Sequence, residues 1–347
     1  MTYWLGYLTV LILGTILCLS LIKFFYRTGR PISKTGVLIG NFTLSLIAIF
    51  LTCMAIEFYF KVFFAQSDAY VFSLSAQNWL EHYWHPINSL GYRDREWSEQ
   101  EVAGKLKVMV VGDSVAAGLG INNYQDRFSN KLNDLLGDEA VVFNVASPGW
   151  HTRQEIEAVI NYPYRPDILI LAYFVNDIEG SAFHQGLERP RFVKDPPPIL
   201  RLLIENSYAL NFLYWRWVRL GQQEGQADYL RWVSDTFNNP DVWWIHQQEL
   251  QTIYEGAQAE GITLIVVVFP NLTSMEESWQ ITEPVLNFFQ ERHIATLDVA
   301  KLIENRRLGD LMVSPVDAHP NEALNLIVAE HLYQMIRASG SASQQAP

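Results

Sequence analysis

The sequence predicts an α/β fold: a three-layer α/β/α sandwich around a mostly parallel five-stranded sheet, preceded by two transmembrane helices. Two observations lead to this prediction. From Lys107 onward, short apolar runs rich in Val, Ile and Leu alternate with longer amphipathic segments, the pattern of a parallel sheet with helical crossovers. Before that point, two long apolar runs carry few charged residues.

Each predicted strand is short and apolar, and each predicted helix repeats apolar residues at helical spacing. The strands are expected at Val108–Val111, Val141–Ala146, Asp167–Phe174, Ile262–Phe269 and Ala295–Val299. The helices are expected at Arg127–Leu136, Gln154–Tyr162, Ile245–Ala259, Pro284–Arg292 and Glu322–Arg337. Right-handed connections between these strands place helices on both faces of the sheet.

The two apolar runs, Tyr3–Phe25 and Gly36–Phe60, are interpreted as membrane spans. At about 1.5 Å per helical residue, each is long enough to cross a hydrocarbon core of roughly 30 Å. A cleaved signal peptide is the alternative for the first run, but no basic residue precedes it and a second apolar run follows at once.

Basic residues set the orientation of these spans. Lys23, Arg27, Arg30 and Lys34 lie in or beside the short connector, so the connector is expected in the cytoplasm and both termini outside it. The protein is therefore expected in a bacterial inner (cell) membrane as a multi-pass protein, with its folded domain on the periplasmic or extracellular side.

The domain plan that follows has four parts. Residues 1–62 form the membrane anchor, 63–106 a juxtamembrane linker, 107–338 the α/β domain and 339–347 a disordered tail. The segment 181–244 is too long for a simple crossover and is interpreted as an insertion rich in aromatic residues. Its rings either form a lid or wall beside a site, or pack the insertion onto the domain or the bilayer interface.

Composition excludes several classes of function. The formal net charge of -12 argues against nucleic-acid binding, which depends on neutralising phosphates. Cys18 and Cys53 are the only cysteines, and each lies in one of the two apolar runs. If the two helices are antiparallel, these residues lie at membrane depths about 15 Å apart, which excludes a disulfide between them. His151 has no second His or Cys at ligand spacing, so we predict no metal and no cofactor.

Polar and glycine residues follow the strands where chemistry is expected. Gly112-Asp113-Ser114 ends the first strand, Gly149 follows the second, Asn176-Asp177 the third, and Asp317-Ala318-His319 precedes the last helix. Because the carboxyl ends of parallel strands meet at one edge, these residues are expected to converge there. Taken singly, Gly149 and Asn176-Asp177 are typical of turns, and His319 followed by proline is typical of a helix start. Gly112-Asp113-Ser114 alone could equally be a tight turn with a capping serine.

This set of residues resembles the SGNH, or GDSL, hydrolase superfamily. The resemblance covers about Lys107 to Met335 without the insertion. Together with the predicted membrane anchor, it suggests a membrane-anchored bacterial member of that superfamily. It implies a flavodoxin-like sheet, with Ser114 as nucleophile and His319 as general base. It also implies an oxyanion hole formed by the backbone N–H groups of Ser114 and Gly149 and the side-chain amide of Asn176. Such a hole stabilises the negative charge of the tetrahedral intermediate.

Two positions depart from the family pattern. Phe174 stands where the third block commonly has glycine, and Val316 where the last block commonly has the acid. The acid here is Asp317, two residues before His319, and in extended chain residues two apart point the same way. Asp317 is therefore the predicted third member of the catalytic set, with Asp298 as the reserve candidate.

The function implied by the resemblance is that of a membrane-anchored, extracytoplasmic serine esterase or O-acyltransferase. It would act through a Ser114 acyl-enzyme on esters of an envelope glycan or a lipid, with a membrane-protein partner left open. The alternative is a catalytically silent domain of the same fold that serves as a glycan-binding or scaffold subunit of a membrane assembly.

Overall fold

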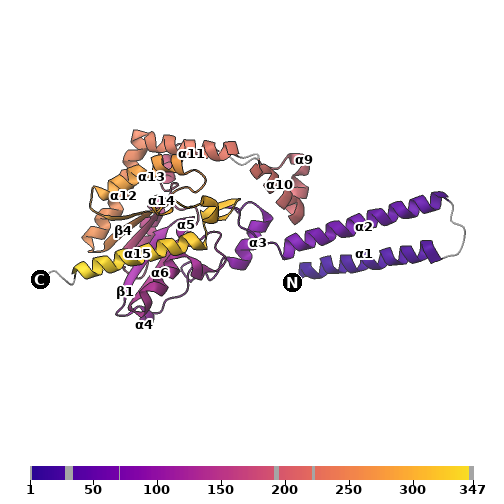
Figure 1. Ribbon diagram of the computed structural model, residues 1–347, viewed down its shortest axis with the longest axis horizontal. Helices are drawn as coiled ribbons and strands as arrows, with labels where there is room; N and C mark the ends of the chain where they lie inside the picture. The colour runs from indigo at the N-terminus through magenta and orange to yellow at the C-terminus, as the bar shows by residue number, and fades with distance from the viewer. Residues whose placement is uncertain (1, 28–33, 70, 191–194, 221–222, 344–347) are drawn as a thin grey trace. The chain divides into compact units, whose positions relative to one another are not determined.

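The computed structural model describes residues 2–27, 34–69, 71–190, 195–220 and 223–343 (Figure 1). The chain divides into two compact units. The first comprises Met1–Gln66, Phe72–Asn78 and Asp195–Trp217, and the second comprises Ser67–Val71, Trp79–Lys194 and Val218–Pro347. The connector around Arg30, at 28–33, and the last four residues of the expected tail, 344–347, lie outside the described residues.

The second unit contains the predicted five-stranded sheet. Its strands are β1 (Leu106–Gly112), β2 (Ala140–Ala146), β3 (Ile168–Tyr173), β4 (Thr263–Val268) and β5 (Ala295–Asp298). They lie in the order β2-β1-β3-β4-β5, and every neighbouring pair is parallel. This is the flavodoxin-like order, in which the chain changes direction between β1 and β3; ligands bind at such a switch point.

Helices cover both faces of this sheet, which confirms the three-layer prediction (Figure 1). Alternate residues of β1 face opposite sides: Met109 and Val111 belong to one core, Val108 and Val110 to the other. One face is covered by α7 (Thr152–Asn161), α11 (Gln223–Asn238), α12 (Pro240–Ala259) and α13 (Met275–Gln290). The other is covered by α5 (Ser114–Ala117), α6 (Phe128–Leu136), α14 (Val299–Ile303) and α15 (Glu322–Ser343).

Several elements differ from those expected. Helix α12 begins at Pro240 rather than at Ile245, inside the segment expected as the insertion. Helix α13 begins at Met275, so Pro284 lies inside it rather than at its start. The earlier turns are stabilised by the acidic first-turn residues Glu276 and Glu277 and by burial of Ile281. A small antiparallel pair, β6 (Met312–Ser314) and β7 (Asp317–Pro320), occupies the expected loop before α15. Helix α15 continues to Ser343, into the expected tail.

Most of the expected linker belongs to the folded α/β unit. Its elements are α3 (Leu74–Tyr83), which begins in the first unit, and α4 (Glu99–Val102). Trp79 and Arg93 are almost completely buried, and Arg93 donates to the carbonyl oxygens of Gly118 and Ile121 at 2.6 and 2.7 Å. This part of the chain is therefore a structural part of the domain.

The insertion is divided between the two units. Helix α9 (Pro198–Asn206) and most of α10 (Tyr208–Leu220) lie in the first unit, whereas α11 follows in the second. In the second unit, Trp232 stacks on Phe183 of α8 (Glu179–His184), and Tyr229 donates to Glu179 at 2.7 Å. These rings of the insertion pack against the core of the α/β unit.

The first unit contains the two N-terminal helices, α1 (Thr2–Arg27) and α2 (Lys34–Val62). Among the described residues, one helix is long and apolar enough to cross a membrane: Lys34–Val62, with a mean hydropathy of 2.1 and little of its surface buried. The apolar stretch described in α1, Leu8–Lys23, is shorter. Cys18 and Cys53 lie on these helices as free thiols.

Candidate active site

Strand β1 delivers Ser114 at the switch point of the sheet. The strand ends at Gly112, and Asp113 caps α5 by accepting a hydrogen bond from the N–H of Val115 at 2.8 Å. A Cβ at position 112 would lie 2.9 Å from the carbonyl oxygen of Ala172 in β3, so only glycine permits this spacing. The tight exit leaves Ser114 as the first residue of the helix, with its side chain only partly covered.

A continuous chain of hydrogen bonds joins Ser114, His319 and Asp317. The Oγ atom of Ser114 lies 2.8 Å from Nε2 of His319, and Nδ1 of His319 lies 2.6 Å from Oδ1 of Asp317. Asp317 and His319 are both on β7, where residues two apart point the same way. The structure therefore brings the three residues together in the order in which a serine nucleophile, a base and an orienting carboxylate act.

Asp317 is fully buried and receives a second donor that the sequence did not indicate. Ser67, in the short segment after α2, donates its hydroxyl to Oδ2 of Asp317. Burial alone would raise the pKa of Asp317, but the charge of His319 and hydrogen bonds from His319 and Ser67 outweigh it and hold the pKa below its ordinary value. The carboxylate is thus kept ionised beside His319.

Asp298, the reserve candidate, has a different place. Its Oδ1 accepts from the N–H of Lys301 and caps α14, and its Oδ2 lies 3.4 Å from the Lys301 ammonium. The carboxylate beside His319 is Asp317.

Gly149 and Asn176 lie in the loops that follow β2 and β3. The first loop is attached to β1 because Ser147 donates its N–H to the carbonyl oxygen of Gly112 at 3.3 Å. Gly149 has a φ of 79°, a left-handed conformation that favours glycine. The Asn176 amide donates to the carbonyl oxygen of Trp150 at 3.1 Å. One N–H of this amide is therefore already donated to a protein acceptor.

Behind these loops lies a group of buried carboxyl groups. Burial raises the pKa of Asp113, although a hydrogen bond from Val115 and the charge of His319 act to lower that pKa. Burial and then the negative charge of Glu155 raise the pKa of Asp177 well above its ordinary value. Burial raises that of Glu155 similarly, and both of its oxygens lack a hydrogen-bond partner among the described residues. Burial therefore disfavours the charged form of each of these groups.

Two further residues singled out in the sequence have structural roles. Phe174, at the position where glycine is common, packs against both cores and donates its N–H to Asp177 at 3.0 Å. His151 precedes the first turn of α7, and its backbone N–H donates to the side chain of Gln154 at 3.2 Å. Across the part of the chain that the structure describes, there is no group of three or more His, Cys, Asp or Glu side chains arranged to hold a metal.

Arg93 and Arg127 contact the turn after α5, a role that the sequence analysis did not identify. Gly118 has a φ of 73°, and a Cβ there would lie 2.5 Å from the side chain of Arg127. The Arg127 guanidinium is fully buried and lies 3.5 Å from Asp94. Arg95, the second arginine of the Arg-Asp-Arg sequence at 93–95, pairs with Glu101 instead.

No protein-family model and no curated protein matches the sequence. Among solved structures, the chain is similar to TesA, with 15% identity, a TM-score of 0.41, and coverage of 67% of this chain and 98% of that one. A lipolytic protein of the G-D-S-L family from Desulfitobacterium hafniense has 16% identity, a TM-score of 0.41, and coverage of 66% and 99%. The esterase EstA from Pseudoalteromonas sp. has 13% identity, a TM-score of 0.41, and coverage of 68% and 98%. The solved structures to which this chain is similar thus include a lipolytic protein of the G-D-S-L family and an esterase.

Proposed function

We propose that the protein is a serine ester hydrolase or O-acyltransferase, anchored by its N-terminal helices with the catalytic unit outside the cytoplasm. The observation that carries the proposal is the hydrogen-bonded chain Ser114–His319–Asp317, with distances of 2.8 and 2.6 Å, at the switch point of a parallel sheet. A serine hydroxyl becomes a useful nucleophile when an imidazole oriented by a carboxylate accepts its proton.

In the first half-reaction, Nε2 of His319 accepts the proton of Ser114 as Oγ attacks the ester carbonyl carbon. Asp317 stabilises the imidazolium that forms. The negative charge on the former carbonyl oxygen is bound by the N–H groups of Ser114 and Gly149 and by the amide of Asn176. His319 then gives its proton to the leaving alcohol, which leaves an acyl group on Ser114.

In the second half-reaction, His319 takes a proton from the incoming nucleophile, which attacks the acyl-Ser114. Water as the nucleophile releases a carboxylic acid, and a sugar hydroxyl receives the acyl group as a new ester. In both cases the proton returns to Ser114 and the enzyme is regenerated. The two outcomes use the same side chains and differ in the acceptor alone.

Hydrolysis of p-nitrophenyl acetate by the purified full chain tests this proposal. The intact protein should release p-nitrophenol, and Ser114→Ala should reduce the rate to that of the uncatalysed reaction. A folded protein whose rate equals that of Ser114→Ala would contradict it and favour the second candidate, a silent glycan-binding or scaffold subunit. The hydrogen bond from the Asn176 amide to the carbonyl oxygen of Trp150 is the observation that keeps this second candidate open.

The proposed setting is a bacterial cell membrane, with esters of an envelope glycan or a lipid as substrates. Its support is the apolar helix Lys34–Val62 and the position of basic residues in the sequence. A reporter that is active only in the cytoplasm, fused after the last residue, should stay silent; activity would refute this topology.

Mass analysis of glycan and lipid acylation in a deletion strain distinguishes the two reactions. An esterase predicts more acyl groups in the absence of the protein, and a transferase predicts fewer.

A further inference from the structure

The short helix α9 has an apolar face that the described residues of its own unit leave exposed. Ile199, Leu202 and Leu203 follow the i, i+3, i+4 spacing of one helix face and expose 88%, 75% and 57% of their surface. On the other side of the helix, Ile204 is buried, and Arg201 forms an ion pair with Glu205. The helix is therefore amphipathic, with its apolar side outward.

Helix α10 repeats this arrangement. Leu210, Leu213 and Trp217 lie on one face and expose 44%, 59% and 70% of their surface. The opposite side contains Asn211, which is buried and accepts a hydrogen bond from the N–H of Leu74 at 2.8 Å. Contiguous apolar exposure of this kind is rare on proteins surrounded by water and is typical of surfaces that meet a membrane or a partner.

The end of α2 is attached directly to these two helices. The carboxylate of Glu57 on α2 accepts hydrogen bonds from the hydroxyl of Ser207 and the N–H groups of Tyr208 and Ala209, at 2.7 to 3.0 Å, and so caps the start of α10. Such a cap also places negative charge at the positive end of a helix. The join between α9 and α10 is thus fixed to a particular turn of α2.

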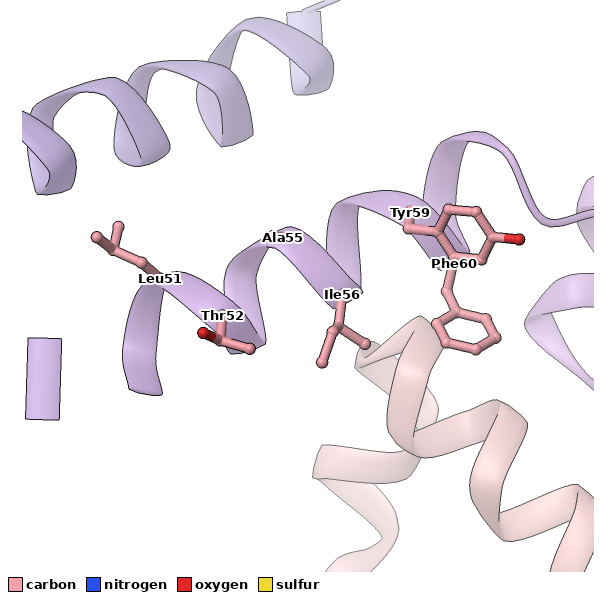
Figure 2. Close-up of a pocket in the computed structure, with 6 residues that line it drawn as sticks. All are labelled: Leu51, Thr52, Ala55, Ile56, Tyr59 and Phe60. Carbon is pink, nitrogen blue, oxygen red and sulfur yellow. The ribbon is translucent and has the colours of Figure 1, made fainter. Parts of the chain in front are cut away.

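Aromatic contacts continue along the same side. The ring of Phe60 lies 4.6 Å from that of Phe212 on α10, and the ring of Phe64 lies 5.0 Å from it. Figure 2 shows Phe60 at one end of a row of side chains on α2, with Ile56, Thr52 and Leu51 beyond it. Further along, Arg216 donates to Gln66 at 2.7 Å. Helix α10 therefore runs beside the end of α2 and the residues that follow it.

These contacts fix the depth of the join between α9 and α10 relative to the end of the apolar helix. Glu57 precedes the last residue of α2, Val62, by five positions, which is about 8 Å along the axis at about 1.5 Å per residue. Amphipathic helices that lie in a membrane interface bury their apolar face about 5–10 Å into the boundary between headgroups and acyl chains. The start of α10 lies at this depth if α2 spans the bilayer.

We propose that α9 and α10 form a membrane-embedded hairpin whose apolar side chains lie in the outer leaflet of the lipid bilayer. The inference rests on the proposed membrane anchoring by α2 and extends it. The occupant of the surface is lipid, because the surface is continuous with the apolar helix through Glu57 and Phe212. The chain then has a third point of contact with the bilayer, contributed by an insertion in the α/β domain.

Fluorescence quenching by lipid tests the hairpin. The full chain, with Cys18→Ser and Cys53→Ser, receives a single cysteine at Leu202, labelled with an NBD fluorophore and reconstituted in vesicles of equal parts phosphatidylcholine and phosphatidylglycerol. We expect a blue-shifted emission and strong quenching by lipids with a doxyl group near the top of the acyl chain. The matched control is Glu205→Cys on the charged side of α9, which should remain unshifted and unquenched.

Two results would overturn the inference. An NBD group at position 202 that emits as in water shows that the face is exposed. A blue shift without quenching shows that protein, either a second copy or another subunit, covers it. Neither result depends on activity, so a failure here is separate from a failure of the proposed chemistry.

A second variant measures the consequence for substrates. Leu202→Glu with Leu203→Glu changes exposed side chains only, so folding should be preserved, with Arg201→Glu as a control of similar charge change on the other face. Hydrolysis of soluble p-nitrophenyl acetate should stay unchanged, whereas hydrolysis of an acyl ester held in the same vesicles should fall about tenfold or more. Equal rates for variant and wild type on the vesicle ester would contradict a role of the hairpin in approaching lipid.

Discussion

Ser67 provides a sharp test of how the candidate site is built. Its hydroxyl donates to Oδ2 of Asp317, and both side chains are buried, so no water replaces the donor freely after Ser67→Ala. The segment is also bent: Ala69 and Val71 have φ values of 69° and 60°, left-handed conformations that cost free energy in residues with a side chain. We infer that Ser67 is a positioning residue, which acts through Asp317 on His319.

The size of the effect follows from the burial of this carboxylate. A hydrogen bond to a charged group contributes about 1.5–3 kcal/mol, and loss of a partner leaves the buried group unsatisfied. If this free energy is lost from the transition state, each 1.36 kcal/mol lowers the rate about tenfold. Ser67→Ala should therefore reduce kcat/KM on p-nitrophenyl acetate by about tenfold to a hundredfold, mostly through kcat.

The pH profile separates positioning from a general loss of stability. Without the Ser67 donor, the Asp317–His319 pair binds a proton more readily, so the acidic limb of kcat/KM should move to higher pH. Ser67→Thr keeps the hydroxyl and should restore the profile. Ser73→Ala, a buried serine that hydrogen-bonds with Ser75 instead, is the matched control. A Ser67→Ala enzyme with the rate and profile of the wild type would refute this reasoning.

Three other predictions follow from the geometry. Asp317→Asn should lower kcat on the order of 10³–10⁴-fold, because the wrong imidazole tautomer then faces Ser114. The control Asp298→Asn should leave kcat nearly unchanged, since Asp298 caps α14. Equal effects of the two variants in a p-nitrophenyl acetate assay would be inconsistent with the site. The pKa of Glu155 is raised in the folded protein. Its contribution to stability is therefore complete below its unfolded pKa of about 4 and is lost as pH rises toward the folded pKa. Between pH 4 and pH 8, the Tm of Glu155→Gln should fall less than the Tm of the wild type. Gly118→Ala should reduce the free energy of unfolding by about 1–3 kcal/mol, because φ is 73° and the new Cβ meets the buried Arg127; an unchanged denaturation midpoint would show that the turn adapts.

The sheet and the meeting of Ser114 with His319 were predictable because they depend on local patterns and one rule of topology. Continuous apolar runs marked the strands, and parallel strands bring their carboxyl ends to one edge. The spacing of Asp317 and His319 sufficed because β7 is extended. The roles of Gly149 and Asn176 as oxyanion donors stay predictions.

Contacts between distant segments were not predictable in the same way. Ser67 and Asp317 are 250 positions apart, and a single serine after an apolar helix carries no pattern. Within the expected linker, Arg93 is charged and yet buried, because it donates to backbone carbonyl oxygens of distant residues. The start of α13 was placed at Pro284 because proline favours the first turn of a helix, but burial of the preceding turn outweighed this preference.

The most direct test of the central claim is the identity of the residue that a fluorophosphonate modifies. The reagent reacts with a serine only when a base activates it, and it mimics the tetrahedral intermediate. Peptide mass analysis of the labelled full chain should find one adduct, on Ser114, which disappears in both Ser114→Ala and His319→Ala. An unlabelled, folded wild-type protein, or an adduct on another residue, would contradict the account.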